Sequence, residues 1–504
     1  MQRTWVRGAL AGLVAGGVGL AISELLAGVL DGAPSLVTAI GALVIDLQPP
    51  GAKQFVVDLV GEADKLVLNL FITAVALGGA AVLGVASRRH WRIGGGGIAL
   101  AAVGAALASL RDPLVDPLLA ALSAILAGGG GALALRHLAG ERAAAVPEMP
   151  AWGRRQFMGS AIGLSALAIV GGGAGRFLLE RRPQPSGTAV PTTLPAVAAA
   201  AAPLPVETIE VDGLSPLVVP TRDFYRIDTK LLVPRLDAGS WSLTIDGMVD
   251  RPLTLSYDQL LAMPLVERYV TIACVSNEVG GGLVGNAKWT GVPLRALLDK
   301  AGVRPGASQV VGRSFDGWTA GFPTLWLEGE GAGALVAVGM NDAPLTAEHG
   351  YPARLIVPGL FGYVSATKWL TNIELTTLDA FDGYWIPLGW AKDGPILLQS
   401  RIDVPRGSVA AGQVAVAGVA WAPTRGIGAV EVQVDGGAWQ PAGLGPAISD
   451  ETWVQWVFRW GATAGDYVVR VRATDRDGMV QEERETRPAP DGARGYHAIR
   501  VNVG

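Results

Sequence analysis

The fold of the soluble half is decided by one stretch, Thr271-Ile-Ala-Cys-Val-Ser-Asn-Glu-Val-Gly-Gly-Gly-Leu-Val-Gly-Asn-Ala-Lys-Trp-Thr-Gly-Val-Pro-Leu294. Cys274 is the only cysteine among 504 residues, so it forms no internal disulfide and no all-cysteine metal site. It ends a β-branched run and faces a glycine-rich loop, which lets backbone approach a ligand closely. A thiolate in this setting suits a soft metal or nucleophilic chemistry. The alternative is a buried structural cysteine, because free cysteine is among the most buried residue types.

Further motifs follow this loop in the chain. They are His349-Gly-Tyr-Pro-Ala-Arg-Leu-Ile-Val-Pro-Gly359, Lys368-Trp-Leu-Thr-Asn-Ile-Glu374, Gly389-Trp-Ala-Lys-Asp-Gly-Pro-Ile396 and Gln399-Ser-Arg-Ile-Asp-Val-Pro405. Together with the cysteine loop, they resemble the sulfite oxidase family of molybdopterin-dependent oxidoreductases. The resemblance runs from roughly Thr221 to the C terminus and does not reach the first half of the chain.

The resemblance implies a molybdenum–molybdopterin cofactor, with Cys274 as the protein ligand to the metal. It implies oxygen-atom or two-electron transfer on a small-molecule substrate, with Cys274 and Arg226 as the catalytic residues. The positions that match cofactor-binding residues of the family are Tyr225, Arg226, Cys274, Asn277, Ser314, His349, Arg354, Ala366, Thr367 and Lys368. Cations among them suit a phosphate tail.

The substrate-binding positions depart from those of sulfite-oxidising members. Glu278 follows Asn277 where those members carry a loop that ends in arginines, and Arg226-Ile-Asp-Thr229 stands where they carry Arg-Asn-His. Their tyrosine beside the metal has no match in residues 315–323. A carboxylate near the site would repel a dianion. The sequence therefore favours a substrate other than sulfite.

The composition of the first half of the chain predicts a membrane protein. Half of all residues are apolar, 17% are charged, the net charge is −4, and no basic stripe predicts nucleic-acid binding. Runs long enough to cross a bilayer lie at Gly8–Leu30, Leu66–Ala86, Ile93–Leu110, Leu114–Leu135 and Phe157–Leu179. The run Ser35–Leu47 is too short to span, and we expect it to be interfacial or re-entrant.

Positive charge orients these spans. The basic clusters are Arg3/Arg7, Arg88-Arg89-His-Trp-Arg92, Arg136/Arg142 and Arg154-Arg155. Because lysine and arginine concentrate on cytoplasmic flanks, the pattern predicts an internal N terminus in the cell membrane and an extracytoplasmic catalytic half. Gly153-Arg-Arg-Gln-Phe-Met158 before an apolar run also fits a twin-arginine export signal. Such a signal suits a protein that crosses the membrane with its cofactor already in place. The alternative is an ordinary positive flank.

The spans show no electron-carrying cofactor site. The four histidines, His90, His137, His349 and His497, lie at span ends or outside the spans, so paired haem ligands are not predicted. We therefore expect a separate electron carrier, cytochrome or quinone-linked. Glu24 and Asp116 lie near span ends, and we interpret both as solvated flanks.

The sequence predicts a multi-domain protein. The predicted parts are a four-span helical bundle (1–145), a fifth span (150–182), a Pro/Ala-rich linker (183–205), an α+β molybdopterin domain (206–382) and an immunoglobulin-like sandwich (383–504). In the family, a domain like the last one forms a homodimer. A non-enzymatic membrane protein whose outer domains bind a partner is the alternative function. A transporter would need polar residues deep in several spans, where they are scarce.

Overall fold

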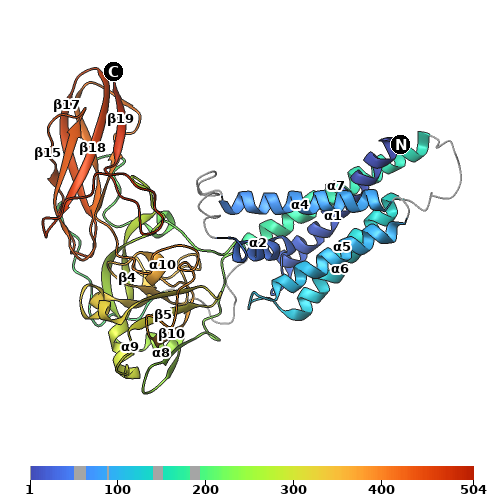
Figure 1. Ribbon diagram of the computed structural model, residues 1–504, viewed down its shortest axis with the longest axis horizontal. Coiled ribbons are helices and arrows are strands. Elements are labelled where there is room, and N and C mark those ends of the chain that lie inside the picture. Colours follow the sequence, from blue (N-terminus) through green and yellow to red (C-terminus); the bar gives the residue numbers. More distant parts are fainter. Residues whose placement is uncertain (1, 50–63, 88–89, 140–150, 182–192) are drawn as a thin grey trace. The chain divides into compact units, whose positions relative to one another are not determined.

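The computed structural model describes residues 2–49, 64–87, 90–139, 151–181 and 193–504. They divide into two compact units (Figure 1). The helical unit comprises Met1–Pro183 and Thr229–Pro234, and the second unit comprises Gln184–Asp228 and Arg235–Gly504.

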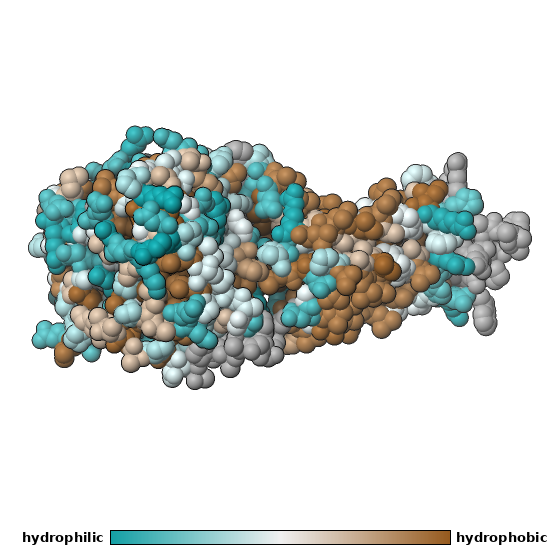
Figure 2. Space-filling view, turned by 90° about the horizontal axis from the view of Figure 1, so that it is seen from below, coloured by the Kyte–Doolittle hydropathy of each residue, from teal (hydrophilic) through white to brown (hydrophobic). Residues whose placement is uncertain are grey.

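Among the described residues, five helices are long and apolar enough to cross a membrane, in agreement with the five predicted runs. They are α1 (Gln2–Val29), α4 (Asp64–Ala86), α5 (Trp91–Ser109), α6 (Pro117–Ala139) and α7 (Ala151–Glu180). Apolar side chains cover the visible face of this unit between more polar ends (Figure 2). The short run forms α2 (Leu36–Asp46), whose 11 residues cannot span a bilayer.

The helices approach one another through small residues. A Cβ atom at Gly12 of α1 would lie 2.0 Å from the Ala80 carbonyl oxygen of α4, and one at Gly84 would lie 2.2 Å from the Gly8 oxygen. Lipid tails are as apolar as leucine, so close packing of backbones drives helix association in a membrane. The α1–α4 contact therefore depends on glycine.

Basic residues gather at one end of the helical unit. The Arg7 guanidinium carbon lies 4.6 Å from the Phe157 ring centroid, and that of Arg136 lies 5.4 Å from a Trp91 ring. These contacts bring the start of α1 to the start of α7, and the end of α6 to the start of α5. Arg7 and Arg136 belong to the basic clusters noted in the sequence. Residues 88–89 and 142 of those clusters lie outside the described residues.

Glu24 is buried, so its interpretation as a solvated flank is wrong. It is 8% exposed, accepts a hydrogen bond from the Ser35 hydroxyl at the start of α2, and lies 3.8 Å from the Arg176 guanidinium of α7. Burial of a carboxylate is tolerable when a cation and a donor accompany it. Asp116, in contrast, is exposed and caps α6 by accepting from the Leu118 and Leu119 amides.

The segment Thr229–Pro234 packs with the helical unit although it follows the start of the second unit in sequence. The Lys65 ammonium donates to the Lys230 carbonyl oxygen (2.7 Å), and the Lys230 ammonium lies 3.3 Å from the Asp112 carboxylate. These contacts involve the start of α4 and the α5–α6 connection.

The α+β part of the second unit contains two sheets. One has the order β2-β1-β10-β5-β6, and the other has the order β3-β4-β7-β8, with β9 also paired to β7. Their strands are β1 (Ser242–Gly247), β2 (Leu253–Ser256), β3 (Val266–Ala273), β4 (Val284–Pro293), β5 (Gln309–Ser314), β6 (Thr319–Pro323), β7 (Leu335–Met340), β8 (Ala343–Pro344), β9 (Arg354–Ile356) and β10 (Leu370–Thr376). Short helices α8 (Tyr257–Leu261), α9 (Leu294–Ala301) and α10 (Gly362–Ser365) connect them.

The C-terminal part is a sandwich of two antiparallel sheets with the orders β11-β13-β17-β16 and β12-β19-β18-β14-β15, apart from the parallel β12–β19 pair. The strands are β11 (Gln399–Val404), β12 (Ser408–Val409), β13 (Gly412–Trp421), β14 (Ile427–Val434), β15 (Gln440–Pro441), β16 (Gly443–Leu444), β17 (Val454–Ala462), β18 (Gly465–Asp475) and β19 (Ala498–Val503). Apolar residues alternate inward along these strands. The predicted architecture of bundle, α+β domain and sandwich is confirmed.

The predicted linker is partly ordered against the α+β domain. The Ala198 amide donates to the Leu265 carbonyl oxygen (2.7 Å), and the Glu267 amide donates to the Ala199 carbonyl oxygen (2.9 Å). Residues 183–192 of that linker lie outside the described residues.

The glycine contact between α1 and α4 can be tested with two substitutions in the same helix. Gly84→Leu places a side chain against α1 backbone and should destabilise the bundle by about 1–3 kcal/mol. Gly78→Leu is the matched control, because a Cβ atom at Gly78 meets nothing within 4 Å. Thermal unfolding of the full chain in detergent, followed by the helical circular dichroism signal, measures both. Equal midpoints for the two variants would contradict the packing argument.

Candidate active site

Cys274 stands directly after β3, where the pairing of β3 with β4 ends at Ala273 and Val284. Its amide donates to the Leu283 carbonyl oxygen (2.9 Å), which closes the loop between the two strands. Its Sγ atom lies 2.9 Å from the Ser276 hydroxyl, and the side chain is only partly buried. The loop therefore presents an oriented, accessible thiol.

Asn277 stabilises this loop from within. Its side-chain oxygen accepts from the Leu283 amide (2.7 Å), and its own amide donates to the Cys274 carbonyl oxygen (3.1 Å). A Cβ atom at Gly281 would lie 2.6 Å from the same side-chain oxygen, so glycine keeps the approach open. Contact of Asn277 with a cofactor stays a prediction.

Arg354 on β9 is a buried cation without a full set of partners. It is 5% exposed, lies 5.0 Å from the Trp289 ring centroid, and donates through Nη1 to the His349 carbonyl oxygen (3.2 Å). Its Nε atom is buried and has no hydrogen-bond partner. Burial lowers the pKa of Arg354 to about 10. A buried guanidinium with an unused donor is suited to an anionic ligand.

Lys368 and Arg226 converge on one carboxylate, that of Asp228. The Lys368 ammonium lies 2.9 Å and the Arg226 Nε atom 3.1 Å from the same Asp228 oxygen, and the Asp228 side chain is 3% exposed. Burial lowers the pKa of Lys368 to about 8, and the charges of Arg354 and Arg226 add to this effect while Asp228 opposes it. Two cations therefore share this buried carboxylate, and Glu348 lies within electrostatic reach of Arg226. The sequence showed Asp228 within a quoted motif but gave no sign of the pairing.

Tyr225 lies within electrostatic reach of Cys274. Burial raises the pKa of the Tyr225 hydroxyl, and the charge of Cys274 raises it further, while Arg354 lowers it. The ring stacks on that of Phe224 at a centroid distance of 5.1 Å. This tyrosine belongs to residues 221–228, here called the opening segment, whereas residues 315–323 contain no tyrosine.

His349 is held in its neutral form. Its Nε2 atom lies 2.9 Å from the Thr221 carbonyl oxygen, and its ring meets that of Phe224 edge-on at 5.8 Å. Burial and, after it, the charge of Arg354 lower the pKa of His349 to about 4. A neutral ring can donate from Nε2 to the carbonyl oxygen and thus fixes the opening segment next to the site.

The remaining predicted residues are Ser314, Ala366 and Thr367. Thr367 is fully buried with an unpartnered hydroxyl, and its carbonyl oxygen accepts from Leu355, the residue after Arg354. Ser314 at the end of β5 pairs with Leu370. Ala366 ends α10, its amide donates to the Gly362 carbonyl oxygen, and it is partly buried. Direct cofactor contact of Ser314, Ala366 and Thr367 stays a prediction.

These groups fit a phosphate-bearing pterin with one thiolate-bound metal. The unused Arg354 Nε atom and Thr367 hydroxyl offer donors, and the buried cations Arg354 and Lys368 suit a phosphate. In the described part of the chain, no three His, Cys, Asp or Glu side chains gather as a metal site. Cys274 as the protein ligand to the metal stays a prediction.

Comparison with known proteins identifies the family. The model of the oxidoreductase molybdopterin binding domain matches residues 230–385. The uncharacterised oxidoreductase YuiH of Bacillus subtilis is 35% identical over 158 residues, which cover 31% of this chain and 76% of that protein. The chain belongs to the molybdopterin-binding oxidoreductases of the sulfite oxidase family. It is thus an enzyme that uses a molybdenum–molybdopterin cofactor.

More distant members of the family have named activities. The mitochondrial sulfite oxidase of Drosophila melanogaster is 31% identical over 187 residues, covering 33% of this chain and 32% of that protein. An NADH nitrate reductase of Oryza sativa is 28% identical over 179 residues, covering 30% and 19%. The chain thus spans a third or less of these two relatives. The structure of the sulfane dehydrogenase SoxCD of Paracoccus pantotrophus shares the fold, with a TM-score of 0.51 and 22% identity over 57% of this chain and 82% of that one.

The lowered pKa of His349 predicts a loss of stability in acid. Its folded pKa of about 4 lies below the usual value of 6.5, so its contribution is complete above pH 6.5 and is lost as the pH falls toward 4. Between pH 7 and pH 5 this amounts to about 2 kcal/mol. Hydrogen exchange of β7 and β9 amides during urea titration measures the change. His349→Gln should be less stable at pH 7 but should lose less stability on acidification; an undiminished loss would contradict the assignment.

Proposed function

We propose that this enzyme is a membrane-anchored, extracytoplasmic oxidoreductase that transfers an oxygen atom or an electron pair at a molybdenum held by Cys274. The observation that carries the proposal is an oriented, partly buried Cys274 thiol in the same domain as a buried guanidinium, Arg354, whose Nε atom has no hydrogen-bond partner. When bound, the molybdenum centre supplies the two-electron redox chemistry.

The chain's own residues bind and orient in this proposal. Cys274 holds the metal, and the Ser276 hydroxyl hydrogen-bonds to its sulfur. Arg354 and Lys368 hold the phosphate end of the pterin, and His349 fixes the opening segment. The raised pKa of the Tyr225 hydroxyl keeps its proton in place at ordinary pH, so it can donate a hydrogen bond to a substrate oxygen.

The charge on the cysteine loop favours a substrate less anionic than sulfite. Glu278 is exposed on this loop, where it places a carboxylate close to Cys274 in the chain. A small molecule of lower charge would meet less repulsion there.

The extracytoplasmic location in this proposal is supported by the charge pattern of the helical unit. With basic flanks on the internal side, five spans, an odd number, would bring the chain after α7 to the external side. The Arg154-Arg155 pair, in the first turns of α7, acts in this proposal as a twin-arginine signal for folded export. Electrons pass to a separate cytochrome or quinone-linked carrier, and the sandwich forms a homodimer.

The role of Cys274 is tested by metal and pterin analysis of the purified full chain. Cys274→Ser should abolish turnover and lower the molybdenum content, because the sulfur is the single protein ligand. Ser276→Ala, which removes only a hydrogen bond to that sulfur, should cost no more than the roughly 10–100-fold typical of an outer partner. Full molybdenum content and turnover in Cys274→Ser would refute the proposal.

The export proposal is tested with two arginine pairs. Arg154-Arg155→Lys-Lys preserves the positive flank but removes the guanidinium groups, so the catalytic half should stay unexported. Arg88-Arg89→Lys-Lys is the matched control on another flank and should be exported normally. Accessibility of the catalytic half to protease in right-side-out membranes reports the outcome. Normal exposure of the first variant would leave the pair as an ordinary charged flank.

A further inference from the structure

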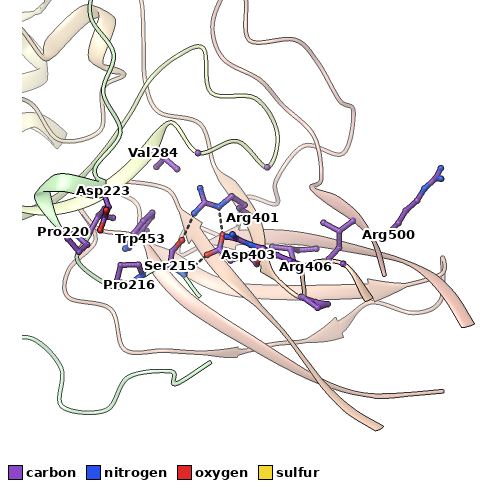
Figure 3. A pocket seen from close by; sticks show the side chains of 17 residues that line it. Ser215, Pro216, Pro220, Asp223, Val284, Arg401, Asp403, Arg406, Trp453 and Arg500 are labelled. Carbon is purple, nitrogen blue, oxygen red and sulfur yellow. Dashed lines mark hydrogen bonds and ion pairs between the residues drawn. The ribbon is translucent and has the colours of Figure 1, made fainter. Parts of the chain in front are cut away.

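An arginine of the sandwich reaches the cysteine loop (Figure 3). The Arg401 side chain on β11 donates to the Gly281 carbonyl oxygen (2.9 Å), the Ser215 hydroxyl (2.8 Å) and the Asp403 carboxylate (2.7 Å). Asp403 in turn accepts from the Ser215 amide (3.0 Å), and its side chain is 3% exposed. The guanidinium is thus fixed on both sides before it reaches the loop.

A histidine of the sandwich touches the neighbouring residue of the same loop. The His497 Nδ1 atom accepts from the Ile402 amide (2.9 Å), which orients the ring. A Cβ atom at Gly280 would lie 2.3 Å from the Nε2 atom of this ring, and Gly280 has a φ of +76°. Glycine is therefore required at this position for both the turn and the close approach.

Packing alone does not hold this part of the loop. Gly280 and Gly282 line a cavity of about 670 Å³ together with Arg401, Asp403 and Trp453. A Cβ atom at Gly282 would meet nothing within 4 Å. The contacts of Arg401 with Gly281 and of His497 with Gly280 therefore hold this part of the loop.

The contacts continue from Gly281 to the thiol. The Gly281 amide donates to the Glu278 carbonyl oxygen (2.9 Å), and Gly281 lies against the Asn277 side chain, which accepts from Leu283. Leu283 then accepts from the Cys274 amide. A shift at Gly281 is thereby passed to the backbone that carries the sulfur.

We propose that Arg401 and His497 are positioning residues that hold the cysteine loop and so fix the direction of the Cys274 thiol. This gives the sandwich a part in the active site, and it explains the Gln399–Pro405 motif of the sequence. The proposal rests on the proposed role of Cys274 as metal ligand, but the loop itself can be examined whether or not that role holds.

Hydrogen exchange of the full chain tests the proposal without recourse to turnover. In Arg401→Gln, the amides of Cys274, Asn277, Gly281 and Leu283 should exchange roughly tenfold faster, because a charge-assisted tether of the loop is lost. Arg401→Lys, which keeps the charge but not the three-way geometry, should fall between wild type and Arg401→Gln.

Arg425→Gln is the matched control. Arg425 pairs with Asp475 at 3.0 Å, and that carboxylate is 1% exposed, so its loss disturbs the same sandwich away from the loop. Its loop amides should exchange at the wild-type rate. Unchanged loop exchange in Arg401→Gln, or an equal rise in Arg425→Gln, would overturn the proposal.

X-ray absorption of the metal-loaded protein gives a second readout. Arg401→Gln should broaden the distribution of molybdenum–sulfur distances and lower kcat with little change in KM. An unaltered sulfur shell would overturn this inference while leaving the proposed function intact. A wild-type spectrum without protein sulfur would instead refute the proposed function.

Discussion

The burial of two cations, Lys368 and Arg354, near Asp228 is the constraint on which the catalytic site depends. Lys368 shares the Asp228 carboxylate with the more exposed Arg226, whereas the Nε atom of Arg354 has no partner. Burying a cation with an unused donor is costly, so an anionic ligand at Arg354 would stabilise the folded site. The same two cations favour a neutral His349, whose protonation would add one more cation to the group.

The two units satisfy their polar groups in different ways. In the helical unit, backbone hydrogen bonds close within each helix, glycine brings α1 and α4 together, and the buried Glu24 pairs with Ser35 and Arg176. In the second unit, a loop between β3 and β4 leaves the sheet at Cys274 and is secured by Asn277 within and Arg401 from outside. Rigid strands thus carry a site whose reactive atom stands on a loop, as is usual for ligand-binding residues.

Local sequence patterns predicted much of this protein. Apolar runs located the five helices, since span length and composition are properties of contiguous residues. The motifs around Cys274 and Arg354 indicated the family and its cofactor, which the comparison with known proteins confirms. The individual residue roles in the site stay predictions.

What sequence reasoning missed are contacts between distant segments. The Asp228–Lys368 pair and the Arg401–Gly281 contact each join residues more than a hundred positions apart. Periodicity and motif spacing describe neighbours along the chain, so they carry no signal for such pairs.

The Glu24–Arg176 pair has a consequence for biogenesis. The acidic member lies in the first span and its cation in the last, so the carboxylate enters the bilayer well before its counterion is synthesised. Until α7 docks, Ser35 of the adjoining turn is the partner available to that carboxylate. Assembly of the helical unit is thereby coupled to insertion of α7, the helix that precedes the catalytic half in the chain. A chain truncated before α7 would leave Glu24 in the membrane without Arg176.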